Sequence, residues 1–184
     1  RTIPNFNVFR PADAKETAVC FRIALENRDT PSALLLTRQG VPVLDNDYAY
    51  LESCVRKGAY TVKDCDGHPE IIFIATGSEV SLAIAAASLI QDKKIRVISM
   101  PCMEIFEQQT SEYKNTLIPK RGCLKITIEA GITSGWEKYA GYNGLSIGLD
   151  RYGASAPGSD LAIEFGFMPS KIEERVRSHL ESLL

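Results

Sequence analysis

The sequence predicts an α/β protein in which a largely parallel sheet is covered by helices on both faces. Short runs in which every residue is apolar, such as residues 71–75 (IIFIA), are typical of strands buried on both faces. These runs alternate along the chain with segments whose apolar residues recur at helical spacing, which favours strand–helix–strand connections. A strand–helix–strand pattern over residues 7–36 adds a smaller unit of the same kind, and its crossover should be right-handed.

The smaller unit begins with a strand predicted over residues 7–10. Pro11 ends this strand, because the residue before a proline avoids helical backbone angles. Asp13 and Glu16 have the spacing of a capping box and predict that a helix begins there. The second strand is predicted over residues 32–36 and is expected to be covered on both faces. The helix between the strands is expected to bury an apolar stripe formed by Ala14, Ala18, Phe21 and Leu25.

Residues 40–69 change in character, since they contain two prolines and three glycines. We interpret this interval as a linker with one short strand near residues 60–63. The second α/β region follows, and Ser170 is expected to cap its last helix, in which Glu173 and Arg177 form an i,i+4 ion pair. The apolar face of that helix should consist of Ile172, Val176, Leu180 and Leu183. Further strands are predicted at residues 71–75, 95–100, 124–129 and 145–149, and further helices at residues 80–90, 111–118 and 136–141.

Composition argues against several classes of function. The 21 basic and 23 acidic residues nearly cancel, so no basic surplus indicates nucleic-acid binding. No apolar stretch approaches the roughly 20 residues of a membrane helix. The first residues include neither an initiator methionine nor a signal-peptide core, which we interpret as an internal start. The five cysteines show no C-x-x-C spacing and are odd in number, which favours reduced thiols in a reducing compartment such as the cytoplasm.

One motif resembles the nucleophile elbow of a serine hydrolase. Residues 144–148 have the pattern G-x-S-x-G, and Asp160 and His179 follow in the order of a catalytic triad. The elbow needs a helix directly after the serine, whereas the residues after Ser146 continue a strand-like run. We therefore interpret the motif as a chance match, as such short patterns often are. His68 and His179 are also too few for a histidine-based metal cluster.

The turn over residues 76–80 (TGSEV) is a second candidate site. It joins a strand to a helix at the sheet edge where open α/β sheets bind ligands, and amides at Gly77 and Ser78 could hold an anion. Because only one glycine is present, neither a dinucleotide fingerprint nor a P-loop is formed, and plain helix capping is the favoured interpretation. Glu129 is a candidate catalytic carboxylate, but the helix dipole explains an acidic residue there equally well, and no second carboxylate is clearly paired with it.

Two arginines mark the ends of predicted parallel strands. Arg10 and Arg38 each lie at the carboxyl end of a strand, at the sheet edge where ligands collect. A guanidinium offers a planar set of donors that suits phosphate or carboxylate, and it stays charged at any working pH. A structural salt bridge explains such an arginine equally well, and spacing alone does not distinguish the two roles.

Seven stretches together resemble the transketolase family, and they follow the order that the family has. The stretches are IPNFNVFRPADAKET, LLLTRQGVPVL, GAYTVKD, FIATGSEVSLA, VISMP, IFEQQTSEY and GLDRYGASAP. They cover essentially the whole chain and correspond to the carboxy-terminal part of a transketolase. Residues 1–45 then resemble the end of the pyrimidine-binding domain, residues 46–69 a linker, and residues 70–184 the carboxy-terminal domain.

The resemblance implies a three-layer α/β/α carboxy-terminal domain with a mixed, mostly parallel five-stranded sheet, whose antiparallel strand is GAYTVKD. It also implies a homodimeric, cytoplasmic enzyme of the pentose phosphate pathway that uses thiamine diphosphate and a divalent cation, magnesium or calcium. Such an enzyme transfers a two-carbon ketol unit between sugar phosphates. We expect neither a nucleic acid nor a membrane as a partner.

Within this chain the resemblance assigns one substrate contact. Arg38, in the stretch T-R-Q, corresponds to the family's arginine that binds the substrate phosphate, whereas no role carries over to Arg10. Gly40 stands where the family more often has asparagine, which could alter the turn that aims Arg38.

The family's other functional residues have no counterpart in this chain. These are the glutamate that activates the cofactor, the metal-binding motif and the histidines around the reacting carbons. We therefore expect no catalytic residue, no bound cofactor and no activity from these 184 residues alone. The alternative hypothesis is a non-catalytic regulatory or assembly module that binds a small anionic ligand at residues 76–80.

Overall fold

The computed structural model describes residues 1–184, which form two sheets. A parallel pair joins β1 (Asn7–Phe9) to β2 (Ser32–Leu34). The main sheet has the strand order β3-β5-β4-β6-β7, and only β3 runs antiparallel, paired with β5. This arrangement confirms the predicted mixed, mostly parallel sheet of five strands. Its strands are β3 (Tyr60–Lys63), β4 (Ile71–Ala75), β5 (Ile95–Ser99), β6 (Leu124–Ile128) and β7 (Leu145–Ile147).

Eight helices and one 3-10 turn at Thr133–Gly135 accompany the strands. The helices are α1 (Ala14–Glu26), α2 (Tyr48–Val55), α3 (Glu79–Leu89), α4 (Met103–Glu107), α5 (Ser111–Leu117), α6 (Glu137–Ala140), α7 (Gly158–Glu164) and α8 (Pro169–Ser182). None of them combines the length and the apolar character that crossing a membrane would require.

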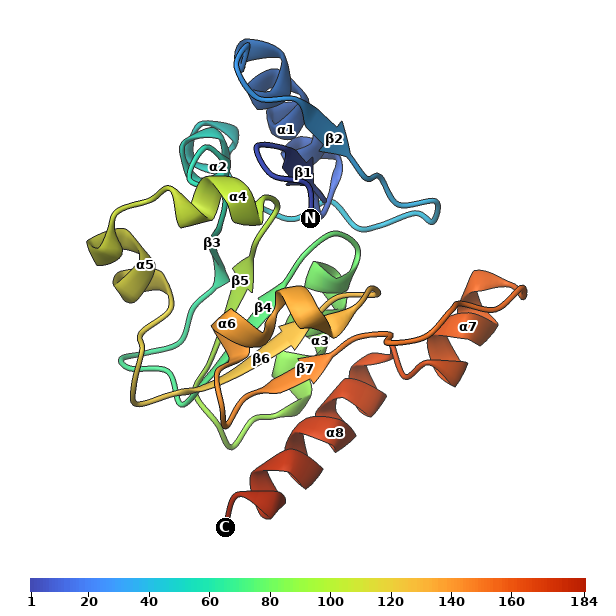
Figure 1. Ribbon diagram of the computed structural model, residues 1–184. Coiled ribbons are helices and arrows are strands. Elements are labelled where there is room, and N and C mark those ends of the chain that lie inside the picture. The colour runs from blue at the N-terminus through green and yellow to red at the C-terminus, as the bar shows by residue number, and fades with distance from the viewer.

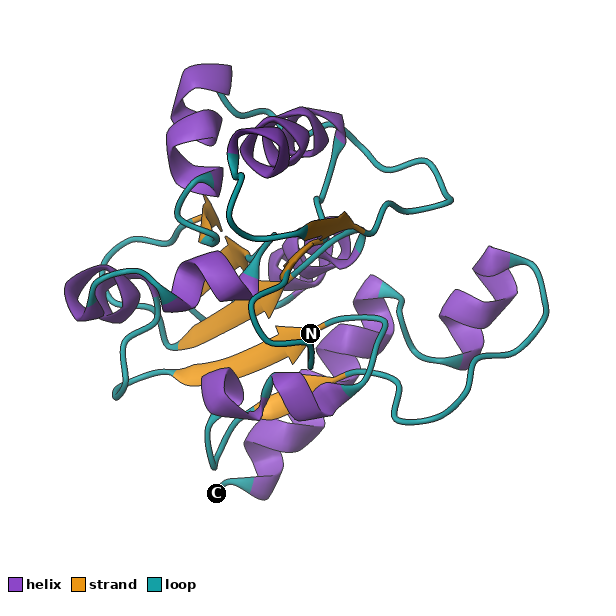
Figure 2. Ribbon diagram, turned by 45° about the horizontal axis from the view of Figure 1, so that its top comes forward, coloured by secondary structure: helices purple, strands orange, loops and turns teal.

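Helices cover both faces of the main sheet, as Figures 1 and 2 show, so that the domain has three layers. The central strand β4 shows why, because its side chains alternate between two buried clusters. Ile71 and Phe73 pack in one cluster with residues of α3 and α8, such as Val176. Ile72 and Ile74 pack in the other cluster with residues of α4, α5 and α6. All five β4 residues are buried, as a wholly apolar strand covered on both faces requires.

The smaller unit, formed by β1, α1 and β2, lies at one end of the main sheet (Figure 1). A third buried cluster joins it to that sheet. In this cluster Phe9 and Val19 of the smaller unit meet Tyr60 of β3 and Cys102 before α4. Helix α2 also contributes to this cluster, so the interval predicted to be a linker contains a helix that the sequence did not indicate. The strand within that interval is β3, an integral member of the main sheet.

Two expectations for the smaller unit are wrong. Strand β2 ends at Leu34, and Leu35 and Leu36 are 48% and 52% exposed, because this pair of strands has no third strand or second helix layer to cover them. The predicted stripe of α1 faces outward, with Phe21 and Leu25 exposed, whereas the helix buries Val19, Cys20, Ile23 and the carboxylate of Glu16. Apolar residues occur around most of α1, so periodicity allowed two faces, and packing against α2 and Tyr60 selected the other one.

The end of the chain agrees with the prediction in part. Helix α8 buries Ile172 and Val176, and Glu173 and Arg177 form the expected ion pair. The helix begins at Pro169 and receives no cap from Ser170, because proline itself suits the first turn of a helix. Helices α4 and α7 were not predicted, since each is shorter than two turns and shows no resolvable period.

Candidate functional site

A cleft of about 710 Å³ separates the smaller unit from the carboxyl ends of β4 and β6. The first residues of the chain, the segment after β2, the turn before α3 and the segment after β6 form its walls. The cleft therefore lies at the sheet edge where open α/β sheets bind ligands. Its charged lining residues are Arg1, Arg10, Glu79 and Glu129.

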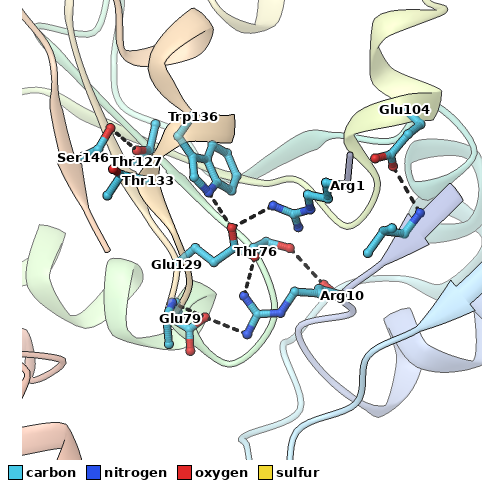
Figure 3. A network of polar contacts seen from close by, with 12 residues as sticks. Arg1, Arg10, Thr76, Glu79, Glu104, Thr127, Glu129, Thr133, Trp136 and Ser146 are labelled. Atoms are coloured by element: carbon cyan, nitrogen blue, oxygen red, sulfur yellow. Dashed lines mark hydrogen bonds and ion pairs between the residues drawn. The ribbon is translucent and has the colours of Figure 1, made fainter. Parts of the chain in front are cut away.

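Arg10 bridges two carboxylates in this cleft (Figure 3). Its Nη1 lies 2.7 Å from Glu129 Oε1, and its Nη2 lies 3.0 Å from Glu79 Oε2. The three side chains are largely buried, with exposed fractions of 17%, 10% and 5% for Arg10, Glu129 and Glu79. Spacing left open whether Arg10 binds a ligand or forms a structural salt bridge. In the structure it forms the salt bridge. It joins the start of α3 to the end of β6.

Glu129 receives two further donors, which sequence reasoning did not find. Arg1 Nη1 lies 2.7 Å from its Oε2, and the Trp136 indole N–H donates to the same oxygen over 2.5 Å. The Arg1 guanidinium also lies over the Trp136 ring, 5.5 Å from its centroid. Both oxygens of Glu129 are thus engaged (Figure 3), which favours a structural role over that of a catalytic base. Since Arg1 is 128 residues away along the chain, no local pattern could have revealed the contact.

The turn over residues 76–80 is already filled by charged side chains of the protein. Gly77 has φ of +62°, a left-handed conformation that favours glycine, and a Cβ there would lie 3.2 Å from the Arg10 guanidinium, which is tighter than an ordinary contact. Ser78 forms no capping hydrogen bond, which makes the expected cap wrong. Its hydroxyl instead donates to Glu79 Oε1 over 2.7 Å. Glu79 Oε2 accepts the amide of Ala130 over 3.1 Å, so a carboxylate of the protein occupies this turn.

Arg38 has surroundings unlike those of Arg10. It is exposed in the loop after β2, and it forms no ion pair or side-chain hydrogen bond, whereas its neighbours Thr37 and Gln39 line the cleft. Its guanidinium is therefore exposed and unpaired, next to residues that line the cleft. Gly40, two residues on, has open space around it and no positive φ, so the asparagine common in the resembling family would fit here without a clash.

A buried carboxylate behind the cleft joins the smaller unit to the main sheet. Glu16 Oε1 accepts the Tyr60 hydroxyl over 2.8 Å and the Ser99 hydroxyl over 2.7 Å, and its Oε2 accepts the Ala12 amide. Burial raises the pKa of Glu16 to about 7 despite these hydrogen bonds. The capping box correctly predicted that Asp13 accepts the Glu16 amide, over 2.7 Å. It gave no sign that the Glu16 carboxylate would be buried.

The hydrolase triad is not assembled. Ser146 lies within β7 and its hydroxyl pairs with that of Thr127 over 3.0 Å, so no strand-to-helix elbow presents it. His179 Nε2 lies 2.9 Å from the carbonyl oxygen of Asn143, and Asp160 lies in α7 with only a hydroxyl as its partner. This confirms that G-x-S-x-G is a chance match here.

The donors of this chain do not fit a metal ion or a metal-bound diphosphate. No three side chains of His, Cys, Asp or Glu gather where they could hold a cation. The two carboxylates of the cleft are paired with arginines, so neither is available as a ligand.

The fold and the cleft together define a two-unit α/β protein whose cleft at the carboxyl edge of the main sheet lies between the units. Residues 1–43 match the transketolase pyrimidine-binding domain, and residues 58–168 match the transketolase-like TK C-terminal domain. The chain belongs to the transketolase family. It is 47% identical to a transketolase of Staphylococcus epidermidis over 97% of its length, and 43% identical to one of Aquifex aeolicus over 96%. It spans 27% and 26% of the length of these two relatives.

Solved transketolases share the fold. The structure from Leishmania mexicana matches 97% of the chain with a TM-score of 0.87 and 36% identity, and the chain covers 26% of it. The structure from Pichia stipitis in complex with sedoheptulose-7-phosphate matches 98% with a TM-score of 0.88 and 36% identity, and the chain again covers 26%.

Proposed function

We propose that this chain is the carboxy-terminal part of a transketolase and that Arg38 binds the phosphate of its sugar-phosphate substrates. The full-length enzyme would transfer a two-carbon ketol unit between sugar phosphates in the pentose phosphate pathway. It would do so as a cytoplasmic homodimer with thiamine diphosphate and magnesium or calcium. The Pichia stipitis relative, solved with sedoheptulose-7-phosphate, supports this class of substrate.

The observation that carries the role of Arg38 is its lack of a partner. Fourteen ion pairs form in the structure and Arg38 takes part in none, and its neighbours Thr37 and Gln39 line the cleft. A guanidinium that the protein leaves unpaired can form two parallel hydrogen bonds to a phosphate without first breaking a salt bridge. Arg38 would therefore hold the phosphate end of the substrate and act by orienting it.

Arg38→Ala in the full-length enzyme tests this role. Losing a charge-assisted contact of about 1.5–3 kcal/mol corresponds to a rise in KM for phosphorylated donors of roughly ten- to a hundred-fold. The KM for a ketose that lacks a phosphate should stay unchanged, because it makes no such contact. Steady-state kinetics with both donors gives the comparison.

Arg28→Ala is the matched control, because Arg28 is exposed and unpaired in the loop before β2, at the opposite end of the same strand. It should leave both KM values unchanged. An unchanged KM for phosphorylated donors in Arg38→Ala would remove Arg38 from the site.

The chemistry itself would depend on parts of the enzyme other than these residues. The donor set described above does not fit the metal, and the cleft carboxylates are already paired. A pure preparation of the 184 residues should therefore show no ketol transfer, and measurable transfer would contradict this prediction.

The alternative, a regulatory module with an anion at Gly77 and Ser78, has weaker support. Glu79 already places a carboxylate at that turn, and a second anion would meet its repulsion.

A further inference from the structure

A second cleft, of about 380 Å³, opens over the face of the main sheet that packs against α4, α5 and α6. Its walls come from the end of α4, from α5, from the segment before β6 and from α6, which share one face of the sheet (Figure 1). Lys125 lies near the start of β6 and Glu129 directly follows that strand. At ~3.3 Å per residue, about 13 Å of strand separate Lys125 from Glu129, the carboxylate that pairs with Arg10.

Four lysines and a single carboxylate give this cleft a strong positive charge. The lysines, which define what we call the lysine cleft, are Lys114, Lys120, Lys125 and Lys138, and the carboxylate is Glu107. The chain as a whole carries a net charge of −2, so the lysine cleft is a local concentration against the overall sign. A concave site lined by charges of one sign focuses its potential and attracts counter-ions.

Glu107 neutralises only one side of the lysine cleft. Its Oε1 accepts the Tyr139 hydroxyl over 2.7 Å and lies 3.0 Å from Lys138 Nζ, while its Oε2 lies 3.4 Å from Lys114 Nζ. Partial burial acts to raise the pKa of Glu107, but the Tyr139 hydroxyl and the two ammonium groups outweigh it, so the pKa lies below its ordinary value. The carboxylate is thus ionised and engaged through both oxygens, and it contacts neither of the other two lysines.

Lys120 and Lys125 have no acidic partner. Lys125 is half-buried, and its Nζ donates one hydrogen bond, over 3.1 Å, to the carbonyl oxygen of Lys120. An ammonium group has three donors, so two of its N–H groups remain unused. Lys120 Nζ forms no hydrogen bond or ion pair, and the side chains of Ser111 and Asn115 on the same wall form none either. These unpaired ammonium groups are therefore available to an anionic ligand.

We propose that the lysine cleft binds a small phosphorylated metabolite, with its phosphate between Lys120 and Lys125. Ammonium groups bind phosphate oxygens as point charges, and the hydroxyl of Ser111 and the amide of Asn115 add neutral donors. Ile118 and Pro119 supply an apolar wall for the rest of the molecule. The volume lies within the range of about 300–1,000 Å³ that is usual for small-molecule sites. This inference does not depend on the function proposed above.

The proposal can be tested by chemical acetylation of the lysines in the expressed protein. Mass spectrometry measures the rate of acetylation at each lysine. Inorganic pyrophosphate is the probe, and sodium chloride of equal ionic strength is the reference. Pyrophosphate should slow acetylation of Lys120 and Lys125 several-fold, because a bound anion covers their amines. Lys63 and Lys171 serve as controls, since they lie on other elements outside the lysine cleft, and their rates should not change.

A substitution distinguishes a specific phosphate-binding site from a general concentration of positive charge. Lys125→Gln keeps most of the side-chain length but removes the ammonium, so pyrophosphate should no longer protect Lys120. Lys63→Gln is the matched control and should leave the protection of Lys120 intact. The melting temperature of each variant checks that the fold is preserved.

Three results would overturn the proposal. Equal protection of all lysines would indicate simple ionic screening, and no protection at millimolar pyrophosphate would indicate no phosphate site. Protection of Lys120 by a polyglutamate peptide but not by pyrophosphate would identify the surface as one for acidic proteins.

Discussion

Arg10 and Arg38 were both predicted at the carboxyl ends of parallel strands, and yet they have opposite surroundings. Arg10 directly follows β1, whereas Arg38 lies in the loop after β2. Arg10 meets Glu79 and Glu129, the second of which is 119 residues away along the chain. Arg38 meets no carboxylate. The sequence could show that each arginine reaches the ligand edge of a sheet, but the partners that decide its role come from distant segments.

Arg10→Met should destabilise the protein. The substitution supplies an apolar side chain of similar length, but it leaves the largely buried Glu79 without a cation and Glu129 with Arg1 as its only cation. Removing one partner of a buried ion pair lowers the free energy of unfolding by about 3 kcal/mol. Urea unfolding at pH 7 measures the change.

Arg38→Met is the control for this measurement. Its side chain is exposed and unpaired, so its effect should stay within about 0.5 kcal/mol. Equal stability of the two variants would show that the Arg10 bridge contributes nothing.

Helix α1 illustrates what periodicity leaves open at the scale of an element. The sequence predicted the start of the helix, because capping by Asp13 is a local interaction. It did not predict the buried face, because α1 carries apolar residues on more than one side. The buried face includes Glu16, a charged residue that a hydrophobicity pattern assigns to solvent. Hydrogen bonds from the hydroxyls of Tyr60 and Ser99 compensate for the burial of Glu16. These two residues belong to β3 and β5 of the main sheet.

Glu16 should make the stability of the protein depend on pH. The folded-state pKa is about 7 against an ordinary value of 4.5, so the folded protein binds the proton more tightly than the unfolded chain. Stability from this group is therefore fully present below about pH 4.5 and is lost as the pH rises through about 7. The loss amounts to roughly 3 kcal/mol.

Glu16→Gln, measured by urea unfolding between pH 5 and pH 8, tests the assignment. Glutamine resembles the protonated carboxyl and does not titrate, so the variant should lack this decline in stability. The same pH dependence in the variant and the unmodified protein would assign the decline to another group.

At the scale of the whole molecule, close backbone contacts decide how the smaller unit, α2 and the main sheet fit together. Gly58 lies between α2 and β3 with φ of +81°, and a Cβ there would be 2.3 Å from the amide nitrogen of Phe106. Its carbonyl oxygen accepts the amide of Cys102 over 3.1 Å. This position therefore admits only glycine, for both conformational and steric reasons.

Gly58→Ala should destabilise the protein more than the left-handed backbone conformation alone would explain, because the added Cβ would also clash with the backbone of Phe106. Gly166→Ala is the matched control, because Gly166 has φ of +76° and open space around it. The control should lose about 1–2 kcal/mol from the left-handed backbone. Gly58→Ala should lose considerably more or fail to fold, as thermal unfolding would show. Similar losses for both variants would argue against the steric contact.

The sequence by itself determined the strands of the main sheet, their largely parallel arrangement and the family. The all-apolar strands and the motifs that carry the resemblance depend only on residues that are close together along the chain. The tertiary structure alone decided which face of α1 is buried, where β2 ends and which arginine is free. Those outcomes depend on long-range contacts such as Arg10 with Glu129 and Glu16 with Ser99, and on electrostatics within a shared cleft. The lysine cleft also depends on the tertiary structure, because only folding brings together its four lysines from separate segments of the chain.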